Sequence, residues 1–334
     1  MNQSRQTTVR LQQMVRAYRQ AATLMAAVEL GLFTAVSKGA RSRDALAKDL
    51  GMTPLNTDRI VTYCLGLGLL QQVDGKLQNA DDVERFLVRG RKEYAGDWML
   101  FTKPEWNDWG RLSEHLQSPE RPVTLGAFAK WTIADARKYH EATYAIGMGA
   151  GSRFVKLVDL SRRKLMIDIG GGSGAYCINA AKAHPGIRAI VLDLPPVVEV
   201  AREFIAENGV ADRVMAEPCD FTKDPFPAGA DVAVMASNQS LYGGDFIRLV
   251  VKKAFDALVP GGEMHMIGHM LNADRTGPPE AAQWALDQAV TRGTGHGHTV
   301  RDIRGYFEMA GFTDIWDGDF LPHMLEWVRG TKPA

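Results

Sequence analysis

The sequence predicts a chain of two parts: a helical N-terminal half with a winged-helix pattern, then an α/β domain. The sheet of the α/β domain is expected to be doubly wound and mostly parallel, with an antiparallel last strand. From about residue 160, short apolar strands alternate with helices, which is typical of such a sheet. A length of 334 residues suits two domains. We expect boundaries that give segments 1–95, 96–150 and 151–334.

The first segment begins with a predicted helix over residues 8–36. Its apolar side chains recur at helical spacing and form one stripe, namely Leu11, Met14, Val15, Tyr18, Ala22 and Met25. The segment itself offers this stripe few partners. A second copy of the chain would cover it, so we expect a homodimer built on this segment.

A helix–turn–helix and a hairpin follow. Ser42 is a plausible cap for a helix that ends at Gly51, and Thr53 begins the next helix. The Asp74-Gly75 turn between LLQQV and KLQN predicts a hairpin. DNA-recognition helices carry several cations, whereas the second helix offers only Arg59. We therefore expect a dimerisation module and no nucleic-acid partner.

The middle segment, 96–150, is expected to be a mostly helical linker that covers a substrate pocket. Its aromatic side chains form a predicted cluster of Trp98, Phe101, Trp106, Trp109 and Trp131. In the last segment, the predicted strands are LMIDIG, RAIVLDL, RVMAEPCDF, ADVAVMAS, EMHMIGHML, TDIWDGDF and HMLEWVRG. The predicted helices are GAYCINAAKAHP, PPVVEVAREFIAENGV, DFIRLVVKKAFDALVPGG and VRDIRGYFEMAGF.

Composition excludes several classes of protein. Lys plus Arg and Asp plus Glu are each 39, so the formal net charge is zero and the chain lacks the positive field of most nucleic-acid-binding proteins. No apolar run is long enough for a membrane span, and the N-terminus lacks a secretory pattern. Three scattered cysteines and no HExxH spacing argue against disulfides and a metal site. We expect a cytoplasmic protein.

A glycine-rich turn carries the first functional signal. The strand LMID runs into Ile169-Gly170-Gly171-Gly172-Ser173-Gly174, and a helix follows. Glycines let a ligand approach the backbone, and a helix N-terminus presents free N–H groups. Asp193 ends the next strand, where an acid binds ribose hydroxyls, and Asp168 sits just before the glycines, where it could orient the loop.

The spacing of this turn discriminates between cofactors. It is not the G-x-G-x-x-G of NAD-binding proteins, and it lacks the Gly-Lys-Ser/Thr ending of ATP-binding loops. An acid before the glycine run suits a ligand without pyrophosphate and with a cationic amino-acid end. S-adenosylmethionine is such a ligand.

DIGGGSG, VLDLP, CDF and LVPGG together resemble the class I methyltransferases. More narrowly, the chain is similar to the small-molecule O-methyltransferases of the caffeate and hydroxyindole group. AAVELGLFTAV and YAIGMGAGSR extend the resemblance over nearly the whole chain. The resemblance implies a Rossmann-like catalytic domain behind a winged-helix dimerisation domain.

The resemblance also implies roles for individual residues. The glycines at 170, 172 and 174 would line the methionine part of the cofactor, and Asn238 would lie near the same end. Asp193 would bind the ribose, while Asp220 and Phe221 would hold the adenine. Met148 matches a methionine that lines the family's substrate pocket, where Trp106 is a further candidate; plain core packing is the alternative for Phe221 and Met148.

The chain departs from this family where the catalytic base is expected. By hand alignment, the family's histidine corresponds to Tyr242, and the two glutamates that orient it correspond to Gly268 and Gly297. Tyrosine, with an unperturbed pKa near 10, is a poor base at neutral pH. Another residue must then act as base, namely His269, His296 or His298, or the acceptor needs no deprotonation.

The second explanation fits a thioether sulfur, which attacks the cofactor directly and becomes a sulfonium. The departure resembles the methylthiohydroxybutyrate S-methyltransferases of dimethylsulfoniopropionate synthesis, and also a pigment C-methyltransferase branch with the same tyrosine. We favour S-methylation of a thioether hydroxy acid whose carboxylate binds Arg292, His296 or His298. The alternatives are O- or C-methylation with an unusual base, a winged-helix regulator that senses S-adenosylmethionine, and a cofactor-binding protein without turnover.

Overall fold

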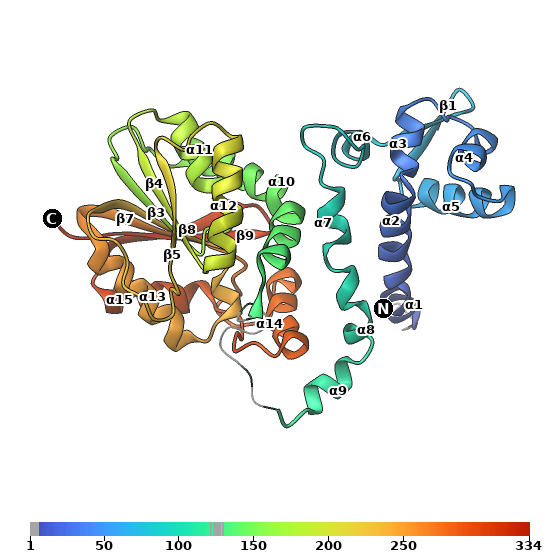
Figure 1. Ribbon diagram of the computed structural model, residues 1–334. Helices are drawn as coiled ribbons and strands as arrows, with labels where there is room; N and C mark the ends of the chain where they lie inside the picture. Colours follow the sequence, from blue (N-terminus) through green and yellow to red (C-terminus); the bar gives the residue numbers. More distant parts are fainter. Residues whose placement is uncertain (1–6, 121, 123–127, 129) are drawn as a thin grey trace, which may run out of the picture. The chain divides into compact units, whose positions relative to one another are not determined.

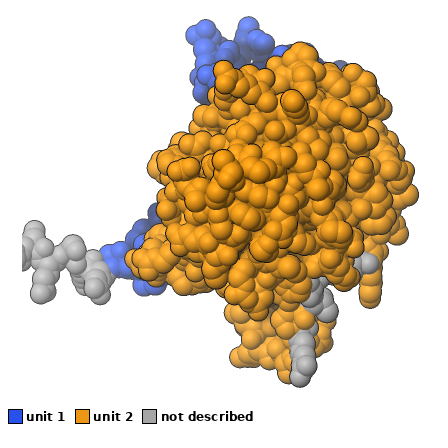
Figure 2. All heavy atoms as spheres, turned by 90° about the vertical axis from the view of Figure 1, so that its left-hand side faces the viewer, with its two compact units in different colours: residues 1–105 blue, residues 106–334 orange. Residues whose placement is uncertain are grey.

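The computed structural model describes residues 7–120, 122, 128 and 130–334. They divide into two compact units, residues 1–105 and 106–334, which have different colours in Figure 2. The boundary predicted after residue 95 lies inside the smaller unit. The boundary predicted after residue 150 lies inside a long helix, α10 (Ile133–Leu157). Residues 121, 123–127 and 129 of the predicted linker lie outside the described part of the chain.

The smaller unit is helical and carries one hairpin. Its elements are α1 (Val9–Arg16), α2 (Tyr18–Leu30), α3 (Leu32–Ser37), α4 (Arg43–Asp49), α5 (Pro54–Gly66), β1 (Leu70–Val73), β2 (Lys76–Asn79), α6 (Asp81–Phe86), α7 (Gly96–Phe101) and the 3-10 turn η1 (Lys103–Glu105). The winged-helix order is confirmed. Ser42 and Thr53 accept backbone N–H groups as N-caps of α4 and α5. Asp74 and Gly75 both have positive φ, which closes the β1–β2 hairpin.

The single helix predicted over residues 8–36 is wrong. The chain forms α1, α2 and α3 instead, with breaks at Ala17 and Gly31. Gly31 is left-handed, with φ of 73°, and ends α2, as glycine commonly does after a helix. The side chains of α1 are exposed, Met14 by 62% and Val15 by 75%, so this end of the apolar stripe remains uncovered within the unit, whereas Ala22 and Met25 on α2 are half-buried.

The larger unit contains the sheet. After α8 (Trp106–Trp109), α9 (Leu112–Gln117) and α10, its elements are β3 (Leu165–Ile169), α11 (Ala175–Ala183), β4 (Arg188–Asp193), α12 (Pro195–Glu207), β5 (Val214–Pro218), β6 (Ala230–Ala236), η3 (Gln239–Leu241), α13 (Gly244–Ala257), β7 (Leu258–Gly268), α14 (Pro279–Thr291), α15 (Val300–Ala310), β8 (Thr313–Leu321) and β9 (Leu325–Thr331).

The sheet has the strand order β5-β4-β3-β6-β7-β9-β8 (Figure 1). Strands β3 to β7 pair in parallel, and β9 pairs antiparallel with both β7 and β8. The chain order reverses between β3 and β6. Ligands of such sheets bind at the carboxyl ends of the strands beside this reversal, which is where the glycine loop begins.

Helices cover both faces of the sheet. Helices α13 and α15 bury Ile247, Val250, Ile303 and Phe307 against one face. Helices α10, α11 and α12 cover the other, with Phe154 and Ile178 among the buried side chains. The predicted doubly wound, mostly parallel sheet is therefore confirmed.

Three details differ from the sequence-based prediction. The helix expected to run through Gly262 ends at Ala257, because Pro260 disfavours helical geometry just before it and β7 begins at Leu258. Helix α14 was not predicted. The expected aromatic cluster is divided: Trp98 stacks on Phe101 in the smaller unit, while Trp131 belongs to the larger one.

Candidate functional site

The glycine loop connects β3 to α11 at the carboxyl edge of the sheet. Gly170, Gly172 and Gly174 have φ of 66°, 56° and 76°, values that other residues seldom adopt. The side-chain amide of Asn238, which follows β6, donates to the Gly170 carbonyl at 2.8 Å. A Cβ at Gly170 would lie 2.5 Å from that amide nitrogen. The loop therefore presents bare backbone, as a close-fitting ligand requires.

Asp193 lies at the end of β4, directly beside this loop. Its carboxylate accepts the N–H groups of Gly172, at 2.9 Å, and Leu194, at 2.7 Å. Burial raises the pKa of Asp193 to about 6, and the two backbone hydrogen bonds oppose this increase. Its partners are neutral N–H groups, so the carboxylate keeps lone pairs for ligand hydroxyls.

The residues predicted to hold adenine follow β5. Asp220 accepts from the hydroxyl and the backbone of Thr222 and from Lys223 at 2.8 Å. The ring of Phe221 packs edge-on against Tyr242, with 5.1 Å between the ring centroids. Tyr242 thus lies on the predicted adenine side of the site. Its phenol is 5% exposed, and burial raises its pKa, so Tyr242 is neutral at pH 7.

Asp168 is a buried carboxylate beneath the loop. It is 1% exposed, and among the described residues it accepts a hydrogen bond from the thiol of Cys177 at 3.9 Å. A Cβ at Gly171 would lie 2.7 Å from this carboxylate. Burial, with repulsion from Asp193 second, raises the pKa of Asp168 to about 7. The described side chains give it no cation, which suits the cationic end of a ligand.

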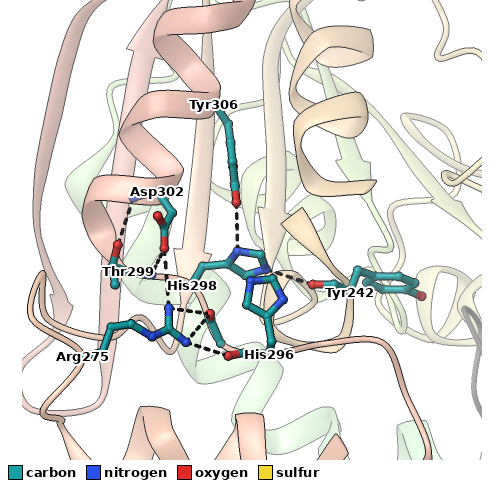
Figure 3. Close-up of polar contacts among 8 residues, drawn as sticks. Tyr242, Arg275, His296, His298, Thr299, Asp302 and Tyr306 are labelled. Atoms are coloured by element: carbon teal, nitrogen blue, oxygen red, sulfur yellow. Dashed lines mark hydrogen bonds and ion pairs between the residues drawn. The ribbon is translucent and has the colours of Figure 1, made fainter. Parts of the chain in front are cut away.

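His298 is occupied by the protein itself. Its Nε2 lies 2.9 Å from the carbonyl oxygen of Tyr242, and its Nδ1 lies 3.4 Å from the hydroxyl of Tyr306. Figure 3 shows this imidazole between the two groups, with the phenol ring of Tyr242 directed away from it. The residue is fully buried, and burial lowers its pKa. These contacts favour a structural role for His298 over that of a base.

Two other predicted site residues of this loop, Arg292 and His296, are exposed. His296 lies beside His298, with 4.9 Å between the rings, and its carbonyl accepts from Arg275 at 3.0 Å (Figure 3). Arg292 ends α14, and its guanidinium forms an ion pair with Glu120. This guanidinium already has a carboxylate partner, and its binding of a substrate carboxylate stays a prediction.

His269 directly follows β7, and its surroundings differ from those of His296 and His298, the other two candidate bases. Its ring stacks on Trp284 of α14, with 5.3 Å between centroids. Its Nδ1 is buried and has no hydrogen-bond partner among the residues that the structure describes. Burial lowers the pKa of His269, while a hydrogen bond to the backbone of Met324 acts in the opposite direction. The ring is therefore held in place and keeps one free nitrogen.

Three other residues with unpartnered polar atoms lie on segments that neighbour this histidine in the fold. Among the described residues, seven buried side-chain N or O atoms lack a hydrogen-bond partner, and four of them belong to one group that we call the polar socket: Gln239 Oε1, His269 Nδ1, Gln288 Nε2 and Thr294 Oγ1. Gln239 is fully buried and Gln288 is 6% exposed. Buried polar atoms are normally hydrogen-bonded, so such a concentration indicates a site for a ligand or ordered water.

The socket residues lie close together although they come from four segments. Gln239 donates to the backbone carbonyl of His269 at 3.3 Å. Gln288 follows Trp284, the stacking partner of His269, by one turn on the same face of α14. A Cβ at Gly293, directly before the threonine, would lie 1.9 Å from Gln288 Oε1. Sequence reasoning identified only His269, because glutamine and threonine carry no motif.

His140 was also missed. It lies on α10, is 8% exposed and faces the glycine loop: a Cβ at Gly172 would lie 2.7 Å from its Cε1 and 3.1 Å from its Nδ1. Burial lowers its pKa to about 4, so the ring is neutral at pH 7. The two residues are far apart in the sequence, and no local signal could have paired them.

The two predicted substrate-lining residues remain untested. Met148 packs beside the apolar cluster around α11, and its sulfur lies 3.5 Å from the amide of Asn179, which favours a role in packing. Trp106 begins α8 and is half-buried.

Comparison with known proteins decides the family. Residues 133–313 match the model of the O-methyltransferase domain, and residues 12–86 match that of the O-methyltransferase dimerisation domain. The chain belongs to the O-methyltransferase family. It is a methyltransferase that uses S-adenosylmethionine, and the smaller unit carries the dimerisation domain.

This O-methyltransferase family member is similar in sequence or structure to the following three proteins. A 3-hydroxy-5-methyl-1-naphthoate 3-O-methyltransferase of Streptomyces sahachiroi is 29% identical, over 88% of this chain and 86% of that protein. The N,N-dimethyltransferase OxyT of Streptomyces rimosus is 28% identical, over 97% and 96%. The structure of human N-acetylserotonin methyltransferase in complex with SAM superposes with a TM-score of 0.83 at 21% identity and covers all of both chains.

The family match supports an enzyme and gives the regulator hypothesis no support. In the described part of the chain, no helix combines the length and the apolar character that a membrane crossing needs.

Proposed function

We propose that this enzyme methylates a hydroxyl group of a small polar molecule, with His269 as the base. The observation that carries the proposal is the buried, unpartnered Nδ1 of His269 within the polar socket. The socket lies at the carboxyl ends of β6 and β7, beside Asn238, whose amide binds the glycine loop. An acceptor in the socket would therefore be close to the cofactor loop.

A hydroxyl must lose its proton to become a good nucleophile, and a neutral imidazole can accept it. Burial lowers the pKa of His269, so the ring is neutral at pH 7. A hydrogen bond from the other ring nitrogen to the Met324 backbone would favour the tautomer in which Nδ1 keeps its lone pair. Tyr242 is neutral and lies beside Phe221, and both nitrogens of His298 are engaged, so neither is suited to this step.

The cofactor residues fit S-adenosylmethionine, which supplies an activated methyl group on a sulfonium when bound. Gly170, Gly172 and Gly174 would turn the backbone of the loop toward its amino-acid end through their positive φ angles. Asp193 offers a carboxylate for ribose hydroxyls, and Phe221 offers a ring for adenine. These side chains hold and orient the ligand and exclude water from the acceptor.

The polar socket also limits the acceptor. Its members are two amides, a hydroxyl and a neutral imidazole, with no cation among them. Gln239 donates its amide N–H to His269, so its free Oε1 requires a donor from the ligand. We therefore propose an acceptor with an uncharged group that donates hydrogen bonds at this place, such as a second hydroxyl or an amide.

The test compares single-turnover methyl transfer in the wild type, His269→Asn and His296→Asn. An acceptor is first found by screening phenols, alcohols, amines, thiols and thioethers with methyl-labelled cofactor. Loss of the base should lower the rate by about 10²–10⁴-fold in His269→Asn and flatten the acid limb of the pH profile. His296→Asn is the control with the exposed histidine. An acid limb that survives in His269→Asn would reject His269 as base.

A second candidate keeps the thioether acceptor. Its supporting observation is that Gln239 fills the space where an orienting side chain at residue 268 would lie: a Cβ at Gly268 would be 2.0 Å from its Nε2. A thioether needs no base, so the single-turnover rate would be flat with pH. The hydroxy-acid form of this acceptor also needs a cation for its carboxylate, and Arg292 is already paired with Glu120.

We further propose that the enzyme is a homodimer assembled through the smaller unit. The support is the dimerisation-domain match and the exposed apolar side chains of α1. The three free, buried cysteines suit a reducing, cytoplasmic compartment.

A further inference from the structure

The imidazole of His140 is a buried polar group with no evident partner. The ring packs edge-on against Tyr139, with 5.1 Å between centroids, and against Trp131 at 6.4 Å. The hydrogen bond found at His140 among the described residues uses its backbone carbonyl, and desolvation is the cause of the lowered pKa of its ring. At 8% exposure the ring is withdrawn from solvent, so its N–H group carries a desolvation cost unless a ligand binds it.

The position of the ring identifies the ligand group. The ring packs directly against Gly172, where a side chain at residue 172 would lie, and the backbone N–H of Gly172 donates to Asp193. Gly172 lies three residues before Ala175, the first residue of α11, and the N-terminus of this nine-residue helix favours negative charge. The carboxylate of Asp168 lies against the neighbouring Gly171. The loop is thus in contact with both an acid and a hydrogen-bond donor.

A zwitterionic amino acid matches this polarity. Its ammonium suits Asp168, and its carboxylate suits the helix N-terminus and an imidazole N–H. We infer that His140 binds the α-carboxylate of the cofactor's methionine moiety through a ring N–H, and so distinguishes complete cofactor from adenosine thioethers that lack the amino-acid end. This assignment depends on the cofactor alone and is independent of the acceptor and its base.

Calorimetric binding tests the inference with three probes. S-adenosylhomocysteine has the complete amino-acid end, 5′-(3-aminopropylthio)-5′-deoxyadenosine keeps only the amine, and 5′-methylthioadenosine has neither group. His140→Phe keeps a ring but has no N–H, His140→Gln keeps an N–H, and Glu141→Gln alters an exposed neighbour on the same helix. Melting temperatures are recorded for every variant.

We expect His140→Phe to bind S-adenosylhomocysteine at least about tenfold more weakly, since hydrogen bonds to charged groups are the strong ones. Its affinity for the two probes without a carboxylate should stay within about twofold. His140→Gln should recover part of the loss, and Glu141→Gln should match the wild type.

Other outcomes would overturn the inference. If His140→Phe bound all three probes more weakly by the same factor, the ring would serve packing alone. If only the two probes with an amine bound more weakly, the ring would contact the ammonium. Unchanged affinities for all three probes would show that the ring does not contact the ligand. Should His140→Phe not fold, His140→Met is the second variant without an N–H, and the same comparison of probes decides.

Discussion

Replacement of Asp168 by asparagine should stabilise the unliganded enzyme, and increasingly so as the pH rises. The carboxylate is 1% exposed and faces the like charge of Asp193. Its pKa rises from 3.8 to about 7, so the folded state binds the proton more tightly than the unfolded chain does. Stability therefore falls as the pH rises from about 4 to about 7, and the full penalty is present above that range.

The magnitude follows from the shift. A rise of about 3 pKa units corresponds to about 4 kcal/mol at pH 8, since each unit is worth about 1.36 kcal/mol. At pH 5 only about 1.6 kcal/mol of this penalty applies. Asp168→Asn should thus gain about 2–3 kcal/mol more in its free energy of unfolding at pH 8 than at pH 5.

Urea titrations of the wild type and the variant at both pH values measure this difference. The exposed carboxylate of Asp49 serves as the control: Asp49→Asn should change stability equally at pH 5 and pH 8. If the stability difference between Asp168→Asn and the wild type did not grow with pH, the carboxylate would not be held in an unfavourable environment, and the argument from burial would be refuted.

Three further predictions concern separate parts of the chain. Gly172→Ala should abolish detectable binding of S-adenosylhomocysteine, because the residue has φ of 56° and its Cβ would meet His140 at 2.7 Å; tight binding in calorimetry would contradict this. Thr299→Ala should destabilise the protein by about 1 kcal/mol in urea titrations, since Thr299 and Asp302 form the capping box of α15; an unchanged midpoint would deny the cap. Deletion of residues 1–20 should yield monomers or aggregates in sedimentation, and a stable dimer would exclude a role of α1 in assembly.

Features with local causes could be predicted from the sequence. The caps at Ser42 and Thr53 act on N–H groups three residues away, and the Asp74-Gly75 turn depends on two adjacent residues. The same holds for the glycine loop and for Asp193, because a strand, a turn and a helix determine where each side chain lies. These signals were enough to predict the fold and the cofactor.

Features that depend on contacts between distant segments could not be predicted. The polar socket joins Gln239, His269, Gln288 and Thr294 only because α14 and the loop after it pack against η3. His140 reaches Gly172 only because α10 packs on α11 and α12. The choice among the three candidate histidines also depends on tertiary contacts, because their residue type is the same. Hydrogen-bond partners distinguish His269, which keeps a free nitrogen, from His298, whose nitrogens are engaged. Sequence alone determined the elements and the cofactor loop, whereas the tertiary structure decided which polar atoms remain unpartnered, because that depends on every segment packed around them.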